Sequence, residues 1–102
     1  MHQLLSDLKT GLRAIYGRRL RALFLFGSYA RGEEDKESDI DVIVILDNYE
    51  RYGIEVDRAS GISAKLSLRY GVSISKVFFR EHDWKEGDTP FLSNVRQEAI
   101  PA

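Results

Sequence analysis

The spacing of apolar residues along the chain predicts two long helices and three strands. Apolar residues recur every three to four positions through residues 4–16 and again through residues 48–70, which is the period of an amphipathic helix. Three shorter apolar runs, at residues 23–26, 40–46 and 72–80, lack this period and are rich in β-branched or aromatic residues. The pattern therefore predicts an α/β fold, with a small mixed sheet of about three strands or slightly more, flanked by helices.

Turn and capping residues indicate where the predicted helices begin and end. Gly17 and Gly71 follow the last apolar positions of the two long helices, where glycine commonly ends a helix. Asp47 is expected to cap the second helix, because Glu50 three residues later completes a capping box. These signals place the second helix between about residues 48 and 70.

The C-terminal part of the sequence is predicted to form a polar loop followed by one short helix. Pro90 lies where a proline fits the first turn of a helix, and an apolar stripe follows it. The members of this stripe are Phe91, Leu92, Val95 and Ala99. Trp84, in the preceding loop, either packs beneath neighbouring elements or remains exposed to contact a partner.

Length and composition limit the classes of protein to which the chain can belong. With 102 residues, 43% of them hydrophobic and 30% charged, the sequence predicts one globular domain over residues 1–102. Its net charge of -1 gives no reason to expect direct binding to nucleic acid or to a membrane surface. The sequence has no cysteine and no apolar run of membrane-spanning length, so a cytoplasmic location is expected. An oligomer is compatible with this composition.

Two short segments carry the chemistry that the sequence offers. Gly27 and Ser28 follow the first apolar run, where a backbone without a side chain can turn sharply and approach a phosphate closely. Asp39 and Asp41 stand two residues apart at the start of the second run, so their side chains point to one face of a strand. Two carboxylates so placed repel each other unless a cation such as Mg²⁺ offsets their charge. The structural alternative makes Asp39 a cap and Asp41 an exposed edge residue, but the pair beside a glycine–serine turn favours a site for a metal-bound nucleoside triphosphate.

These segments resemble the signature of the DNA polymerase β-like nucleotidyltransferase superfamily. The match consists of residues 27–32, Gly-Ser-Tyr-Ala-Arg-Gly, and residues 38–42, Ser-Asp-Ile-Asp-Val, with ten residues between Ser28 and Asp39. It looks most like the minimal nucleotidyltransferases, a small prokaryotic branch whose members often occur as antitoxins beside a helical HEPN-domain partner. The resemblance is specific over about residues 20–47 and is compatible in the order of elements to about residue 98.

The resemblance implies an activity and a role for each motif residue. The implied enzyme is a Mg²⁺-dependent nucleotidyltransferase that moves AMP from ATP to a hydroxyl, such as a tyrosine of a cognate HEPN toxin, and so acts as an antitoxin. Asp39 and Asp41 are then the catalytic residues and the metal ligands, while Gly27, Ser28 and Arg31 bind the nucleotide. The alternative is a catalytically silent module that binds nucleotide or partner and neutralises the partner by forming a stoichiometric complex.

The third predicted strand departs from the superfamily pattern. A third carboxylate commonly acts there as a base or a metal ligand, but the matching position in this sequence is Ser73, or Ser75 in a shifted register. A serine hydroxyl is neither anionic nor a useful base at neutral pH. Three explanations stay open: transfer with two carboxylates, a carboxylate supplied from elsewhere in the chain, or a degenerate site that only binds. The candidates for a supplied carboxylate are Glu55, Asp57, Glu81 and Asp83.

Arg31 and the acidic run after it border the predicted site. Residues 29–32 are expected to make a short helical turn, from which Arg31 can pair with phosphate or brace the Asp39 end of the strand. Residues 33–37, Glu-Glu-Asp-Lys-Glu, are predicted to be a solvated loop near the mouth of the site. Their acidity would repel a triphosphate unless the loop points away.

Overall fold

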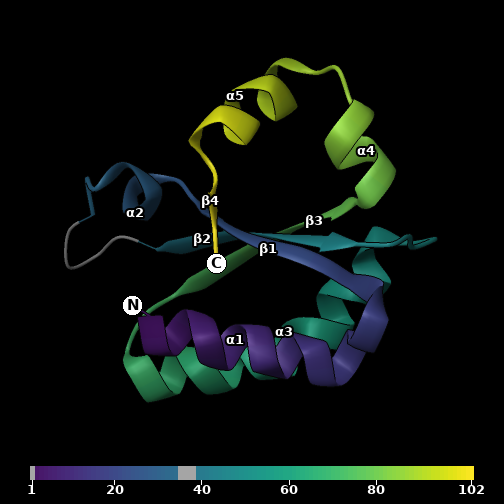
Figure 1. Ribbon diagram of the computed structural model, residues 1–102. Coiled ribbons are helices and arrows are strands. Elements are labelled where there is room, and N and C mark those ends of the chain that lie inside the picture. The colour runs from purple at the N-terminus through teal and green to yellow at the C-terminus, as the bar shows by residue number, and fades with distance from the viewer. Residues whose placement is uncertain (1, 35–38) are drawn as a thin grey trace.

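A four-stranded mixed sheet with helices on both faces is the centre of the fold (Figure 1). The computed structural model describes residues 2–34 and 39–102, so Ser38 of the second motif and residues 35–37 of the acidic run lie outside the described residues. The elements in chain order are α1 (His2–Tyr16), the 3-10 turn η1 (Gly17–Arg19), β1 (Leu20–Phe26), α2 (Ser28–Arg31), β2 (Ile40–Leu46), α3 (Tyr52–Tyr70), β3 (Ile74–Arg80), α4 (Glu81–Glu86), α5 (Pro90–Glu98) and β4 (Ile100–Pro101).

The sheet has the strand order β3-β2-β1-β4. β1 runs antiparallel to both β2 and β4, whereas β2 and β3 are parallel and are connected through α3. The predicted mixed sheet is therefore confirmed, and β4 is the strand that the apolar pattern did not reveal. β4 is only two residues long and includes Pro101, which has no N–H to donate to a ladder.

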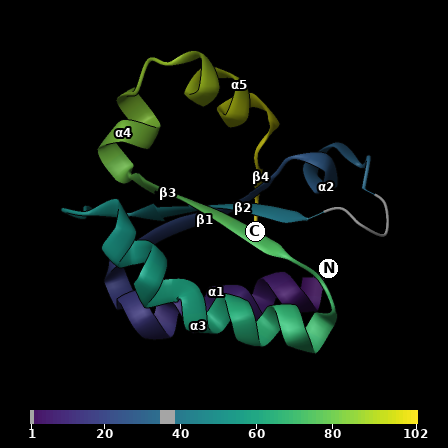
Figure 2. The ribbon, with the colours of Figure 1, turned by 180° about the vertical axis from the view of Figure 1, so that it is seen from behind.

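Strand β2 contributes residues to two hydrophobic cores, one on each face of the sheet, because both of its faces are covered. Its even-numbered residues pack towards α1 and α3, whereas Ile43 and Ile45 pack towards Trp84 of α4 and the apolar side of α5. Figure 1 shows α1 and α3 below the sheet and α4 and α5 above it, and Figure 2 shows the same layers from behind. Burial on both faces explains why β2 reads as a continuous apolar run rather than as an alternating one.

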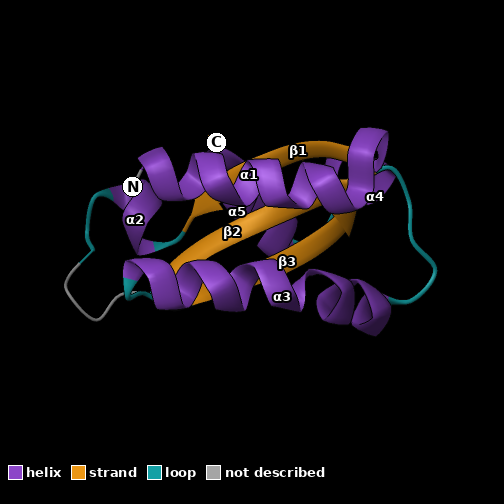
Figure 3. Ribbon diagram, turned by 90° about the horizontal axis from the view of Figure 1, so that it is seen from below, coloured by secondary structure: helices purple, strands orange, loops and turns teal. Residues whose placement is uncertain are grey.

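Helices α1 and α3 lie side by side beneath the sheet, as Figure 3 shows. The Tyr70 hydroxyl of α3 donates a hydrogen bond of 2.6 Å to Asp7 of α1. Gly11 of α1 packs closely against Ile62 of α3, because a Cβ there would overlap the Ile62 side chain. Both helices end where their glycines predicted, and Gly71 adopts a left-handed conformation with φ of +67°.

The predicted capping box at the start of α3 is wrong. The helix begins at Tyr52, and its N-cap residue Arg51 makes no side-chain capping bond. Asp47 instead accepts hydrogen bonds from Arg19 at 3.2 Å and from the Asn48 N–H at 2.7 Å. The Asp47 carboxylate thus pairs with Arg19, which is distant in sequence, and does not cap the helix as the local pattern predicted.

The predicted polar loop after β3 contains helix α4. Trp84 in this helix is 9% exposed, with its ring 5.0 Å from that of Phe24 and 5.7 Å from that of Phe79. Trp84 therefore packs beneath neighbouring elements and is not exposed to contact a partner. The predicted final helix is confirmed as α5, with Pro90 in its first turn and the Thr89 side chain accepting a hydrogen bond from the Leu92 N–H.

Within the described ranges, every helix is too short or too polar to cross a membrane.

Candidate functional site

The two sequence motifs meet where β1 ends and β2 begins. Phe26, the last residue of β1, is the register partner of Asp41 on β2. Gly27 then turns the chain into α2 with φ of +75° and ψ of -153°, a conformation that only glycine adopts without strain. The turn brings the backbone against the Asp41 carboxylate, whose Oδ2 a Cβ on Gly27 would overlap. Glycine is therefore required here both for the turn and for the space that it leaves.

Asp39 and Asp41 lie close enough for their charges to interact. Asp39 is exposed just before β2, whereas Asp41 is half-buried on the sheet face that also carries α4 and α5. Burial raises the pKa of Asp41 above its ordinary value, and the charge of Asp39 raises it further. Arg31 acts in the opposite direction. This arrangement concentrates negative charge at the start of β2 and favours the binding of a cation.

Short helix α2 places Arg31 beside the aspartates. The Arg31 N–H donates to the Gly27 carbonyl at 3.1 Å, and the Glu33 N–H donates to the Ser28 carbonyl at 2.8 Å. The guanidinium of Arg31 lies 3.0 Å from a carboxylate oxygen of Glu33 and 3.5 Å from one of Glu98. Sequence reasoning missed Glu98, since a residue 67 positions away carries no local signal of this contact.

The β2–β3 register identifies the residue opposite Asp41. Ser75 is its register partner, and Ser73 lies two residues earlier, where its carbonyl accepts a hydrogen bond of 2.8 Å from the Ile40 N–H. Both serines are exposed. The structure thus favours Ser75 over Ser73 as the position that matches a third carboxylate.

The four carboxylates proposed as substitutes lie elsewhere. Glu55 and Asp57 are on α3, beneath the sheet, where Glu55 is buried and pairs with Arg58 at 3.3 Å. Asp83 pairs at 3.4 Å with Arg80, whose register partner Leu46 is at the far end of β2 from Asp41. Glu81 lies within 4 Å of both Arg21 and Lys85. In residues 2–34 and 39–102, no three acidic, histidine or cysteine side chains group as a metal site.

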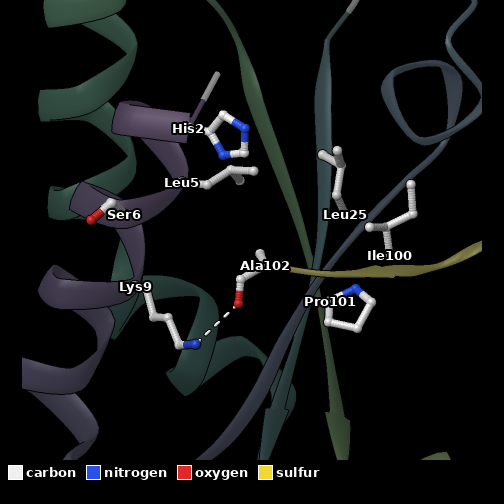
Figure 4. Close-up of a pocket in the computed structure, with 8 residues that line it drawn as sticks. All are labelled: His2, Leu5, Ser6, Lys9, Leu25, Ile100, Pro101 and Ala102. Atoms are coloured by element: carbon white, nitrogen blue, oxygen red, sulfur yellow. Dashed lines mark hydrogen bonds between the residues drawn. The ribbon is translucent and has the colours of Figure 1, made fainter.

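A separate cavity of about 410 Å³ lies on the other face of the sheet. Figure 4 shows it between α1 and β4, with the Lys9 ammonium donating a hydrogen bond of 3.0 Å to the Ala102 carbonyl. Its lining residue Leu25 belongs to the core beneath the sheet, whereas Phe26 beside Asp41 packs above it. The cavity is therefore distinct from the site formed by the two motifs.

Comparison with known proteins gives this geometry a family. A family model described as a nucleotidyltransferase domain matches residues 5–101. The chain belongs to the nucleotidyltransferase domain family. This membership confirms the superfamily resemblance and the predicted enzyme class, and it covers almost the whole chain.

Relatives of this nucleotidyltransferase include named protein adenylyltransferases. It is 33% identical over 95 residues to a candidate protein adenylyltransferase of Methanocaldococcus jannaschii, covering 92% of this chain and 89% of the relative. It is 35% identical over 54 residues to the protein adenylyltransferase MntA of Shewanella oneidensis, but that match covers only 49% of this chain and 39% of MntA. These relatives support the assignment of this chain to the nucleotidyltransferases.

The fold of this nucleotidyltransferase also matches solved structures. A toxin–antitoxin crystal structure with AMP-PNP aligns with a TM-score of 0.68 and 20% identity, over 94% of this chain and 69% of that one. At this level of identity the match shows a shared fold. It confirms the α/β sheet with flanking helices that the apolar pattern predicted.

Proposed function

We propose that this nucleotidyltransferase transfers AMP from ATP to a hydroxyl group, that of a tyrosine on a HEPN-type toxin, and acts as an antitoxin in the cytoplasm. The observation that carries the proposal is the packing of Gly27 against the Asp41 carboxylate, with Asp39 beside it. Two features of the relatives support the finer parts of it. One relative is named a protein adenylyltransferase. A solved structure with the same fold is a toxin–antitoxin complex with AMP-PNP.

Asp39 and Asp41 are the proposed ligands of Mg²⁺. Burial and mutual repulsion both act against the charged form of Asp41, and a divalent cation offsets this cost. Carboxylate oxygens are also the donors that Mg²⁺ prefers, and Gly27 leaves the carboxylate free of a neighbouring side chain. When bound, Mg²⁺ neutralises the charge on the phosphate oxygens during transfer. These ligands therefore fit the metal that the family resemblance implies.

Gly27, Ser28 and Arg31 are the proposed nucleotide-binding residues. The side-chain-free turn at Gly27 lets phosphate approach the backbone, and the Ser28 hydroxyl and Arg31 guanidinium donate hydrogen bonds to phosphate oxygens. The acceptor oxygen then bonds to the α-phosphorus, while the bond from that phosphorus to the α–β bridging oxygen breaks and pyrophosphate leaves. The hydroxyl proton passes to solvent, because the residue opposite Asp41 is an exposed serine rather than a carboxylate.

The serine opposite Asp41 also favours a second candidate function. A chain without a base at this position acts as a silent module if positioning and metal charge do not suffice for transfer. Such a module neutralises its partner by covering it, one copy for each partner molecule. The two functions differ in whether Asp39 and Asp41 are needed.

The test is AMP transfer to the candidate helical partner. Purified chain, partner, Mg²⁺ and ATP labelled at the α-phosphate are incubated, and intact mass is measured for both proteins. We expect the partner to gain one or more AMP units with substoichiometric enzyme, and we expect Asp39→Asn to abolish the gain while leaving the circular dichroism spectrum unchanged. Asp57→Asn is the matched control, because Asp57 is exposed on α3 beneath the sheet. Transfer by an Asp39→Asn/Asp41→Asn double variant would contradict the assignment, and a tight complex without transfer would establish the silent module.

A further inference from the structure

The Arg31 guanidinium is shared by two carboxylates from different parts of the chain. Glu33 follows it in sequence and lies 3.0 Å away, whereas Glu98 is the last residue of α5 and lies 3.5 Å away. The three side chains are 44%, 65% and 47% exposed, in the order Arg31, Glu33 and Glu98. Exposed ion pairs of this kind contribute little stability, so a stronger anion can displace them readily.

The sheet places Glu98 at the mouth of the site. Ile100 of β4 pairs with Leu25 of β1 in antiparallel register, so the chain two residues before Ile100 approaches Gly27, two residues after Leu25. Figures 1 and 2 agree that the C-terminal end of α5 comes down beside α2. Glu98 is therefore close to the turn at which we place the phosphates.

The charge around this turn is unfavourable for a triphosphate. The carboxylates of Glu33 and Glu98 contact the Arg31 guanidinium. The charge of Arg31 also acts on Asp41, which Asp39 opposes. Mg²⁺ offsets the aspartates, but Arg31 remains occupied by the glutamates. Glu33 holds the Nε of Arg31 and Glu98 holds its Nη1. A phosphate group can therefore form a bidentate pair with Arg31 only by replacing one of the two carboxylates.

We propose that Glu98 is a positioning residue for nucleotide binding, which holds Arg31 across the mouth of the site until a triphosphate displaces it. Glu33 follows α2 directly in the chain, whereas Glu98 belongs to α5. The ion pair between Glu98 and Arg31 therefore holds the end of α5 to α2 only while no nucleotide is bound. The inference rests on the proposed nucleotide site. It assigns Glu98 a competitive role: its carboxylate lowers the affinity for nucleotide by occupying the group that the phosphates need.

The test is a double-mutant cycle on nucleotide affinity. The dissociation constant of AMP-PNP with Mg²⁺ is measured by calorimetry at low ionic strength for wild type, Glu98→Gln, Arg31→Gln and the double variant. We expect Glu98→Gln to tighten binding about two- to fivefold, the range of an exposed ion pair, and to lower KM for ATP with kcat unchanged. In the Arg31→Gln background the same change should lose most of this effect.

Glu86→Gln is the matched control, since Glu86 is an exposed acid at the end of α4. It should leave affinity unchanged, and thermal melts should show that all five proteins remain folded. The inference would be overturned if Glu98→Gln left the affinity for AMP-PNP unchanged or weakened it. It would also be overturned if Glu98→Gln tightened binding equally in the wild-type and Arg31→Gln backgrounds. Neither result would affect the nucleotide site itself. Failure of the wild-type protein to bind AMP-PNP would instead reject the nucleotide site itself, and the inference with it.

Discussion

At Gly27 two separate constraints act on one residue. Its backbone conformation is one that side chains disfavour, and its missing side chain leaves room for the Asp41 carboxylate. Gly32, at the other end of α2, shares only the first constraint, because its φ is +70° but a Cβ there would meet nothing within 4 Å. The two glycines therefore separate backbone strain from disturbance of the site.

We expect Gly27→Ala and Gly32→Ala to differ in activity more than in stability. Each should lower the free energy of unfolding by about 1–3 kcal/mol through backbone strain. Only Gly27→Ala should also displace Asp41, and it should reduce AMP transfer about 100-fold. Urea unfolding and initial transfer rates measure the two effects. Equal loss of activity in both variants would show that the Gly27–Asp41 contact has no special part in the site.

At the scale of elements, the outer edge of β3 is closed by side chains from the loop before α3 and from its first turn. The Tyr52 hydroxyl accepts a hydrogen bond of 3.1 Å from the Phe78 N–H, and the Tyr49 hydroxyl donates one of 3.2 Å to the Phe78 carbonyl. β3 also carries Lys76, whose ammonium contacts the Ser63 hydroxyl of α3 and whose pKa is lowered by burial. Such devices protect an edge strand against pairing with another chain.

The contact between α1 and α3 should give the protein a pH-dependent stability. The hydrogen bond from Tyr70 lowers the pKa of Asp7 below its ordinary value of 3.8, with further contributions from Gln3 and Arg69. A lowered pKa stabilises the fold at pH above 3.8, and this stabilisation is lost as the pH falls through the lower value of the folded state. We expect Asp7→Asn to lower Tm near neutral pH, and the difference from wild type to disappear in strong acid. Thermal melts between pH 7 and pH 2 measure it.

Tyr70→Phe provides the matched variant for this contact. It retains the Asp7 carboxylate but removes the hydroxyl that donates to it, so its Tm difference from wild type should shrink over the same acid range. A destabilisation by either variant that is the same at all pH values would mean that the charge of Asp7 is not what the contact stabilises.

At the scale of the whole molecule, one sheet joins two cores. The core beneath it is formed with α1 and α3, and the core above it with α4 and α5, and successive residues of β2 contribute to each in turn. If β2 separated from either core, the apolar residues of the other core would also be exposed to solvent. The two layers should therefore unfold together.

Trp84, the single tryptophan of the chain, allows this coupling to be measured. It lies in the upper core, so its fluorescence follows α4 and α5, whereas far-UV circular dichroism is dominated by the longer helices α1 and α3 beneath the sheet. We expect the two signals to give the same midpoint in urea. A fluorescence midpoint at lower urea would show that the upper layer separates first, as its two-residue attachment through β4 would allow.

The parts of the structure that the sequence predicted have strong local signals. The two long helices have a sustained apolar period and glycine stops, and β2 is rich in β-branched residues and contains no glycine or proline. The glycine–serine turn and the paired aspartates were recognisable because each occupies a fixed place relative to a strand end. Helix α4 had no such signal, since Trp84 is its single buried residue and the others are polar.

The sequence by itself determined the fold class and the members of the two motifs, because hydrophobic period and turn chemistry are local properties. Only the tertiary structure decided which distant groups meet. It took Asp47 from the helix cap to Arg19, placed Ser75 rather than Ser73 opposite Asp41, and joined Glu98 to Arg31. Each of these depends on strand register or on the packing of α5 over the sheet. Register and packing depend on contacts among residues of both cores that are far apart in sequence, and no single stretch of sequence contains all of these contacts.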